Sequence, residues 1–177
     1  MSGMAKVELA DIACSIARTV GIVGERWTPL ILRDLFVGIT RFEDLRRDLG
    51  IASNVLADRL RTLREHDIVE TRVYQDNPTR TEYVLTERGR DLYPVLAMLV
   101  AWGDRWLATP DGPPVTVVHR DCGHTTEGVV VCRHCAGPLT AANVTWHPGP
   151  GGRPGPGASL VGGYLTPLPE ALSRDAE

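Results

Sequence analysis

Three cysteines and three histidines between residues 119 and 135 carry the strongest chemical signal in this chain of 177 residues. Cys132-Arg133-His134-Cys135 is a C-x-x-C, and His119-Arg120-Asp121-Cys122 is an H-x-x-C that precedes it. Zinc accepts thiolate and imidazole ligands in tetrahedral sites, and a zinc ribbon supplies them from two such knuckles on neighbouring strands. The spacing therefore predicts one structural zinc, with His124 as an alternative to His119. The predicted ligands are His119, Cys122, Cys132 and Cys135.

Two short apolar runs, Val115–Val118 and Gly128–Val131, are predicted to be the strands that position these knuckles. Gly123 and Gly137 follow the last cysteine of each knuckle, where glycine allows the backbone to turn its N–H groups toward sulfur. The alternative is a metal-free ribbon whose cysteines are buried or oxidised in pairs. A catalytic zinc and a redox dithiol are both disfavoured, because four protein ligands leave no position for water and no helix is expected to begin at the C-x-x-C.

Upstream, a helix with a single apolar stripe is predicted from Ser53 to Arg64. Its leucines at positions 56, 60 and 63 fall at i, i+4 and i+7, so they share the core face. Ser53 is the expected N-cap. The opposite face is polar, and we expect it to enter the major groove of DNA. The expected base-edge contacts are Ser53, Asn54, Ala57 and Arg61.

A hairpin is predicted directly after this helix. Residues 68–74 and 81–86 have the β-branched and aromatic content of strands, and Gln75–Arg80 has the composition of a turn. A helix followed by such a hairpin has the order of a winged helix, with the hairpin tip beside the minor groove. Thr40, Arg41 and Arg80 are the expected contacts to phosphates or to that groove.

Two further helices precede the stripe-bearing one. Glu25–Val37 has Pro29 in its first turn and Gly38 as its stop, and Arg41–Gly50 is shorter. A short glycine-containing turn between helices is typical of a helix-turn-helix.

The segment from Glu87 to Leu107 is predicted to be one long helix, capped by Thr86 and bent at Pro94. Between residues 92 and 107 its apolar side chains cover nearly the whole circumference, so it must be buried on all sides. A second copy of the chain is the simplest partner, and the helix predicted at Leu9–Val20 is expected to join the interface. The alternative is a core formed inside one chain, under the C-terminal module.

A series of short motifs is spread from Cys14 to Gly103. They are Cys14, Gly24-Glu25-Arg26-Trp27-Thr28, residues 30–35, Arg41-Phe42-Glu43-Asp44-Leu45, Gly50-Ile51-Ala52, residues 56–60, Asn77-Pro78, Tyr83-Val84-Leu85-Thr86 with Gly89, and Trp102-Gly103. With these motifs in this order, the chain resembles the HxlR-type bacterial transcription regulators of the MarR-like winged-helix group. The resemblance implies a homodimeric, sequence-specific regulator of double-stranded DNA, gated by a small ligand or by thiol oxidation.

Cys14 corresponds to a cysteine that senses electrophiles or oxidants in several regulators of this type. Arg18 follows one turn later, where its charge would favour the thiolate. The alternative is that Cys14 is a small core residue of an apolar helix. A further alternative is a small-molecule-gated sensor whose ligand lies in the dimer interface, near Trp27, Trp102 and Trp106.

The charge of the chain bears on the choice between a DNA-binding regulator and a protein-binding adaptor. The net charge of −3 argues weakly against a nucleic-acid binder, but residues 41–64 hold six arginines against four acidic residues. The alternative function is a winged-helix adaptor that binds another protein and has no DNA operator. Nucleotide-binding and hydrolase motifs do not occur in the sequence, so an enzyme is not expected.

The predicted architecture is mainly α with small β: a winged helix-turn-helix at 1–109, a zinc-ribbon-like β module at 110–147, and a Pro/Gly-rich linker and tail at 148–177. The tail contains one helical candidate, Pro169–Asp175, and its Tyr164 and Leu165 are candidates to pack on the ribbon. The longest apolar run, Leu92–Trp102, is far below the roughly 20 residues that cross a bilayer, so a cytoplasmic protein without a membrane partner is expected.

Overall fold

The computed structural model describes residues 7–167 and divides them into two compact units. One unit runs from Arg26 to Val131, and the other combines residues 7–25 with residues 132–167. These units are divided after residues 25 and 131, whereas the predicted domains end at residues 109 and 147. The predicted domain limits stay predictions. Within the described range, no helix is both long and apolar enough to span a membrane.

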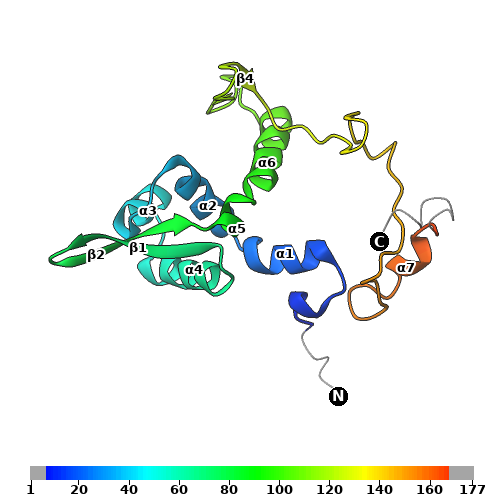
Figure 1. The fold of residues 1–177 in the computed structure, drawn as a ribbon, viewed down its shortest axis with the longest axis horizontal. Helices are drawn as coiled ribbons and strands as arrows, with labels where there is room; N and C mark the ends of the chain where they lie inside the picture. Colours follow the sequence, from blue (N-terminus) through cyan, green and yellow to red (C-terminus); the bar gives the residue numbers. More distant parts are fainter. Residues whose placement is uncertain (1–6, 168–177) are drawn as a thin grey trace. The chain divides into compact units, whose positions relative to one another are not determined.

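The larger unit begins with three helices, α2 (Thr28–Val37), α3 (Phe42–Leu49) and α4 (Ser53–Glu65), shown in Figure 1. Gly38 and Gly50 adopt left-handed conformations with φ of 95° and 62°, which confirms both predicted helix ends. Two starts differ from the prediction: α2 begins at Thr28 rather than Glu25, and Ala52 rather than Ser53 is the N-cap of α4.

The core of this unit is aliphatic and lies between the three helices and the start of the hairpin. The leucine stripe of α4 is confirmed, because its three leucines are at most 1% exposed. The buried apolar residues are Ile31, Leu32, Leu35, Leu45, Ile51, Leu56, Leu60, Leu63, Ile68 and Val69.

The wing is an antiparallel hairpin of β1 (Val69–Asp76) and β2 (Thr79–Leu85). Its strands extend further than predicted, so that only Asn77 and Pro78 remain in the turn, joined by a cis peptide bond. The expected loop from Gln75 to Arg80 is therefore wrong, because four of its own residues are paired in the ladder, Gln75 with Arg80 and Asp76 with Thr79. Tyr74 has no pairing partner and forms a bulge that shifts the register.

The predicted continuous helix from Glu87 to Leu107 is two helices, α5 (Glu87–Arg90) and α6 (Tyr93–Trp106). Thr86 is the predicted N-cap of α5, and its hydroxyl accepts the Gly89 N–H at 3.0 Å. Pro94 lies in the first turn of α6, where its missing N–H has no helical partner to lose. Pro94 therefore starts a helix rather than bending one, which corrects the expectation.

No residue of α6 is buried within the chain, and its two faces differ. One face meets the segment that follows β4: a Cβ built on Gly128 would lie 3.2 Å from the Cβ of Ala97. The opposite face is a stripe spaced by four, three and four residues, which we call the α6 stripe. It consists of Val95, Leu99, Trp102 and Trp106, each 46–62% exposed. The chain thus covers part of α6 and leaves the stripe open.

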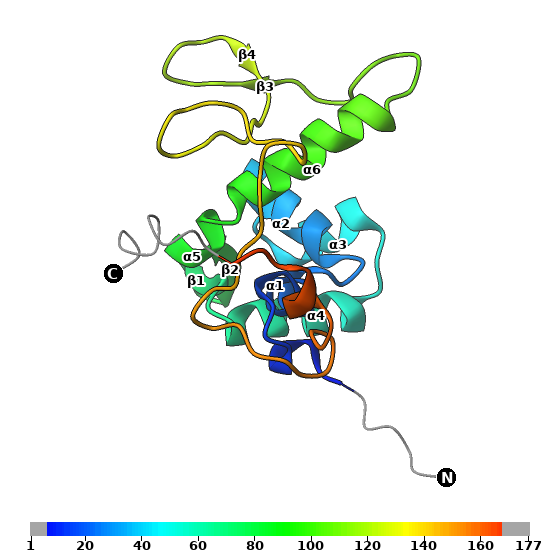
Figure 2. The same ribbon diagram turned by 90° about the vertical axis from the view of Figure 1, so that its right-hand side faces the viewer.

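The ribbon region of this unit forms one small hairpin, β3 (Val117–Val118) with β4 (Thr125–Thr126), beyond the end of α6 (Figure 2). The second strand was predicted at Gly128–Val131, and that assignment is wrong. The H-x-x-C turn reverses the chain at once, since the His119 N–H donates to the His124 carbonyl at 2.9 Å. Thr125 and Thr126, directly after this turn, therefore pair with β3 in place of the predicted strand.

In the other unit, the predicted helix Leu9–Val20 is a single 3₁₀ turn, η1 (Leu9–Asp11), followed by α1 (Ser15–Val23). Its C-terminal part contains α7 (Val161–Tyr164), and Gly157 packs on the side chain of Ile12. Tyr164 is 87% exposed, so it packs on no ribbon within this unit. The helical candidate Pro169–Asp175 lies outside the described residues.

Candidate nucleic-acid interface

Helix α4 presents its polar face to solvent next to the wing. Burial of the leucine stripe turns the opposite side outward, and all four predicted base-contact residues have exposed side chains. They are Ser53, Asn54, Ala57 and Arg61. The N-terminal turns of a recognition helix are the part that meets base edges in the major groove, and three of these four residues lie there.

Arg61 is held along the surface of α4 by two acidic neighbours. Its guanidinium donates to the Asp58 carboxylate and lies 3.7 Å from the Glu65 carboxylate, while its side chain stays 65% exposed. Arg59 also donates to Asp58, at 2.5 Å. Exposed pairs of this kind contribute at most about 1 kcal/mol each. Arg61 can therefore exchange its acidic partners for DNA at small cost.

The loop between α2 and α3 is bonded to the wing, and this affects two predicted DNA contacts. The Thr40 hydroxyl donates to Glu82 Oε2 at 2.7 Å, and the Thr40 carbonyl accepts the Tyr83 N–H at 2.8 Å. The Arg41 guanidinium stacks on the Tyr74 ring, 4.5 Å from its centroid. Both residues thus have partners in the hairpin. The third expected contact, Arg80, is exposed beside the hairpin turn.

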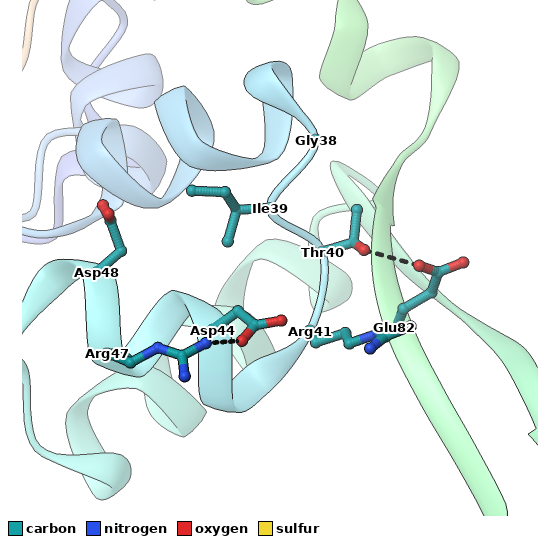
Figure 3. Close-up of a pocket in the computed structure, with 8 residues that line it drawn as sticks. All are labelled: Gly38, Ile39, Thr40, Arg41, Asp44, Arg47, Asp48 and Glu82. Carbon is teal, nitrogen blue, oxygen red and sulfur yellow. Dashed lines mark hydrogen bonds and ion pairs between the residues drawn. The ribbon is translucent and has the colours of Figure 1, made fainter.

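Thr40, Arg41 and Glu82 line an open groove of about 760 Å³ between α3 and β2 (Figure 3). The figure shows the Thr40 hydroxyl directed at the Glu82 carboxylate, with Arg47 turned to Asp44 at the other side. The groove is polar and charged, with two arginines and three acidic residues. Its lining is Gly38, Ile39, Thr40, Arg41, Asp44, Arg47, Asp48 and Glu82.

Glu82 was not predicted as a site residue, yet its carboxylate connects the loop and the hairpin at this groove. Its Oε1 accepts from Arg72 Nε at 3.0 Å and from Arg72 Nη2 at 2.8 Å, and its side chain is 15% exposed. The hydrogen bond from Thr40, and after it that from Arg72, holds the pKa of the Glu82 carboxyl below its usual value. The signal in the sequence was the pair Arg72 and Glu82, but only the observed register places them opposite each other.

Asp34, on α2, is a buried carboxylate that is 1% exposed. Arg33 donates to its Oδ1 at 2.8 and 2.6 Å, and donates to Asp48 Oδ2 at 3.0 Å, which ties α2 to α3. Asp34 Oδ2 has no hydrogen-bond partner within residues 7–167. Burial raises the pKa of Asp34, and Arg33 opposes that rise.

Helices α3 and α4, followed at once by the β1–β2 hairpin, have the element order of a winged helix-turn-helix. The model of the HxlR-like helix-turn-helix family matches residues 22–111. This chain belongs to the HxlR-like family. It is a family of helix-turn-helix transcription regulators.

An uncharacterized HTH-type transcriptional regulator of Mycobacterium tuberculosis is 46% identical over 137 residues, which cover 77% of this chain and 87% of the relative. The structure of PA1607, a candidate transcription factor, is 36% identical with a TM-score of 0.70 and covers 78% of this chain and 96% of its own. PA1374 of Pseudomonas aeruginosa is 35% identical with a TM-score of 0.54, and covers 79% and 95%. These likenesses extend well beyond the HxlR-like segment.

The first knuckle lies outside the HxlR-like segment and is formed by one hairpin. His119 Nδ1 lies 3.4 Å from Cys122 Sγ, whereas His124 Nδ1 lies 2.8 Å from the Cys122 carbonyl oxygen. Gly123 has a φ of 72°, the left-handed turn expected after the cysteine. Of the two histidines considered, His119 is thus the one with a ring nitrogen near the thiol.

The second knuckle, in the other unit, has the same local form with one difference. The Cys132 N–H donates to the Gly137 carbonyl at 2.7 Å, and Ala136, not Gly137, takes the left-handed conformation, with a φ of 56°. The N–H groups of Cys135 and then His134 point at the Cys132 sulfur and lower the pKa of that thiol. No three histidine, cysteine or carboxylate side chains converge as ligands in the described part of the chain. The zinc stays a prediction.

Cys14 lies on the other side of the HxlR-like segment, before residue 22, and it is the N-cap residue of α1. Its side chain is half-buried, and its carbonyl accepts the Arg18 N–H at 3.1 Å. Redox sensing by Cys14 stays a prediction.

Proposed function

We propose that this protein is a sequence-specific DNA-binding transcription regulator that acts as a homodimer. Helix α4 lies in the major groove, and the hairpin tip with Arg80 lies beside the minor groove. The observation that carries the proposal is the exposed polar face of α4, opposite three fully covered leucines and next to the wing. Membership of the HxlR-like family supports it.

The α6 stripe supports the homodimer. Its four residues follow the spacing of a helix-packing seam, and two of them are tryptophans more than half exposed. Large contiguous apolar surface on a soluble protein marks an interaction site, and a two-fold axis lets one stripe pack on its own copy. Dimerisation then places two α4 helices on two half-sites of one operator.

The test is binding of the purified protein to the DNA upstream of its own gene, measured by fluorescence anisotropy at several salt concentrations. We expect Arg61→Ala to weaken specific binding by about 1 to 3 kcal/mol. In the proposed complex Arg61 faces the major groove of the DNA, and a specific side-chain contact to a base is worth that much. The control is Arg88→Ala, which removes the same charge from an exposed position on α5.

Unchanged affinity in Arg61→Ala, with normal thermal stability, would remove Arg61 from the interface. The protein-interaction adaptor is the competing function, and it predicts equal affinity for the upstream fragment and for random DNA of the same length. The net charge of −3 is the observation behind that alternative.

A further inference from the structure

The Glu82 carboxylate joins three parts of the winged helix. Oε2 accepts from Thr40 in the α2–α3 loop, and Oε1 accepts twice from Arg72 across the hairpin. Both oxygens are therefore occupied, and the side chain is only 15% exposed in a groove that is otherwise open to solvent. A carboxylate hydrogen-bonded to a charged partner makes the stronger class of protein hydrogen bond.

The residues on either side of these contacts strengthen the same connection. The Thr40 carbonyl pairs with the Tyr83 N–H, so the loop adds one backbone bond to the edge of β2. Arg41, next along the chain, stacks on Tyr74, which is the bulged residue of β1. The loop that leads directly into α3 is thus attached to both strands of the wing.

The negative charge of Glu82 opposes DNA binding at this edge of the hairpin, so we expect another role for this residue. Phosphates are repelled by a carboxylate, and the neighbouring Thr40 and Arg41 are themselves predicted phosphate contacts. Arg72 compensates the charge of Glu82, and the geometry of Glu82 satisfies the loop and the hairpin at once. Both of its oxygens already accept hydrogen bonds from Thr40 and Arg72, so its role in the wing needs no contact with DNA.

We infer that Glu82 is a positioning residue that fixes the wing against the helix-turn-helix. This inference rests on the proposed DNA-binding function. With Glu82 in place, Arg80 near the hairpin tip meets the DNA backbone while α4 lies in the major groove. Without it, the hairpin keeps its β1–β2 ladder but loses its side-chain bond to the α2–α3 loop. Arg80 then contacts DNA in only a fraction of complexes.

The experiment compares Glu82→Ala with Glu70→Ala. Glu70 is an exposed residue of the same strand as Arg72, so the control removes the same charge from the same hairpin. Both variants are titrated with the upstream DNA over a range of salt. For Glu82→Ala we expect the slope of log affinity against log salt to fall by up to about 0.9 for each phosphate that the wing no longer neutralises. The control slope should stay unchanged or rise.

Two further readouts separate positioning from general damage. Methylation interference should show major-groove contacts of α4 retained in Glu82→Ala, while hydroxyl-radical protection at the minor groove disappears. Hydrogen exchange without DNA should show faster exchange of the Tyr83 N–H, which is bonded to Thr40, and no change in Glu70→Ala.

An unchanged salt slope and footprint in a folded Glu82→Ala would overturn the inference. Equal weakening of the major-groove and minor-groove footprints would also overturn it, because that result indicates a general structural role. If the unmodified protein does not distinguish its upstream fragment from random DNA, the proposed function itself fails. In that case faster Tyr83 exchange alone would still show that Glu82 holds the wing.

Discussion

Leu99→Asp is the substitution that most directly tests how α6 is used. Leu99 lies in the middle of the α6 stripe and is 55% exposed in the single chain. Burying a whole leucine side chain contributes about 1.5 to 3 kcal/mol, so covering the exposed half contributes about 1 to 1.5 kcal/mol in each protomer. A two-fold interface uses the residue twice. The apolar loss alone is therefore about 2 to 3 kcal/mol per dimer.

That loss corresponds to a dissociation constant about 30 to 140 times weaker, since each 1.4 kcal/mol is tenfold. The aspartate adds to it, because an unpaired charge inside an interface costs several kcal/mol more. We therefore expect monomers, or aggregates, at concentrations where the unmodified protein is dimeric. Specific DNA binding should disappear with the dimer.

Sedimentation velocity over a concentration series measures the effect directly. The control is Val37→Asp, which places the same charge on a valine of α2 that is 72% exposed and outside the stripe. It should leave the dimer intact. A monomeric unmodified protein at micromolar concentration would refute the reasoning, and so would equal dissociation by both variants.

Two predictions concern other parts of the chain. Protein prepared without chelators should contain about one zinc per chain by elemental analysis. Cys135→Ser should lose this zinc and Cys14→Ser should keep it; a metal-free unmodified protein would contradict the prediction. Asp34 has a raised pKa when folded, so the folded chain binds that proton more tightly than the unfolded chain, whose carboxyl titrates near 3.8. The difference in unfolding free energy between the unmodified protein and Asp34→Asn should therefore shift in favour of the unmodified protein as the pH falls from 7 toward 4. Urea titrations at several pH values measure this difference. The opposite trend would show that burial does not dominate the pKa of Asp34.

The helix-turn-helix was predictable because its signals are local. Gly38 and Gly50 mark helix ends through their own backbone preference, and the leucines of α4 carry the 3.6-residue period of a buried face. Pro94 was misread for a related reason. Proline is tolerated in a first turn and damaging in an interior, and the sequence did not show that the chain breaks before it.

The Glu82 contacts were not predictable because they depend on a bulge. Without it, a hairpin with Gln75 opposite Arg80 would pair Arg72 with Tyr83. The extra residue, Tyr74, shifts the pairing by one and places Glu82 across from Arg72, while its own ring lies under Arg41. No residue type in this strand demands a bulge, so the register, and with it the groove, became visible only in the structure.

The ion pairs of the helix-turn-helix determine how much net positive charge this acidic protein can offer to DNA phosphates. Three of the five arginines on α3 and α4 are paired with acids three residues away: Arg46 with Glu43, Arg47 with Asp44, and Arg61 with Asp58. Each exposed pair is weak and exchanges readily for a phosphate, yet each acid left behind lowers the net attraction. One protomer therefore offers few net charges to the backbone. In the proposed dimer, two protomers joined through the α6 stripe would present these charges together, so we expect operator affinity to depend on dimerisation more than on any single arginine.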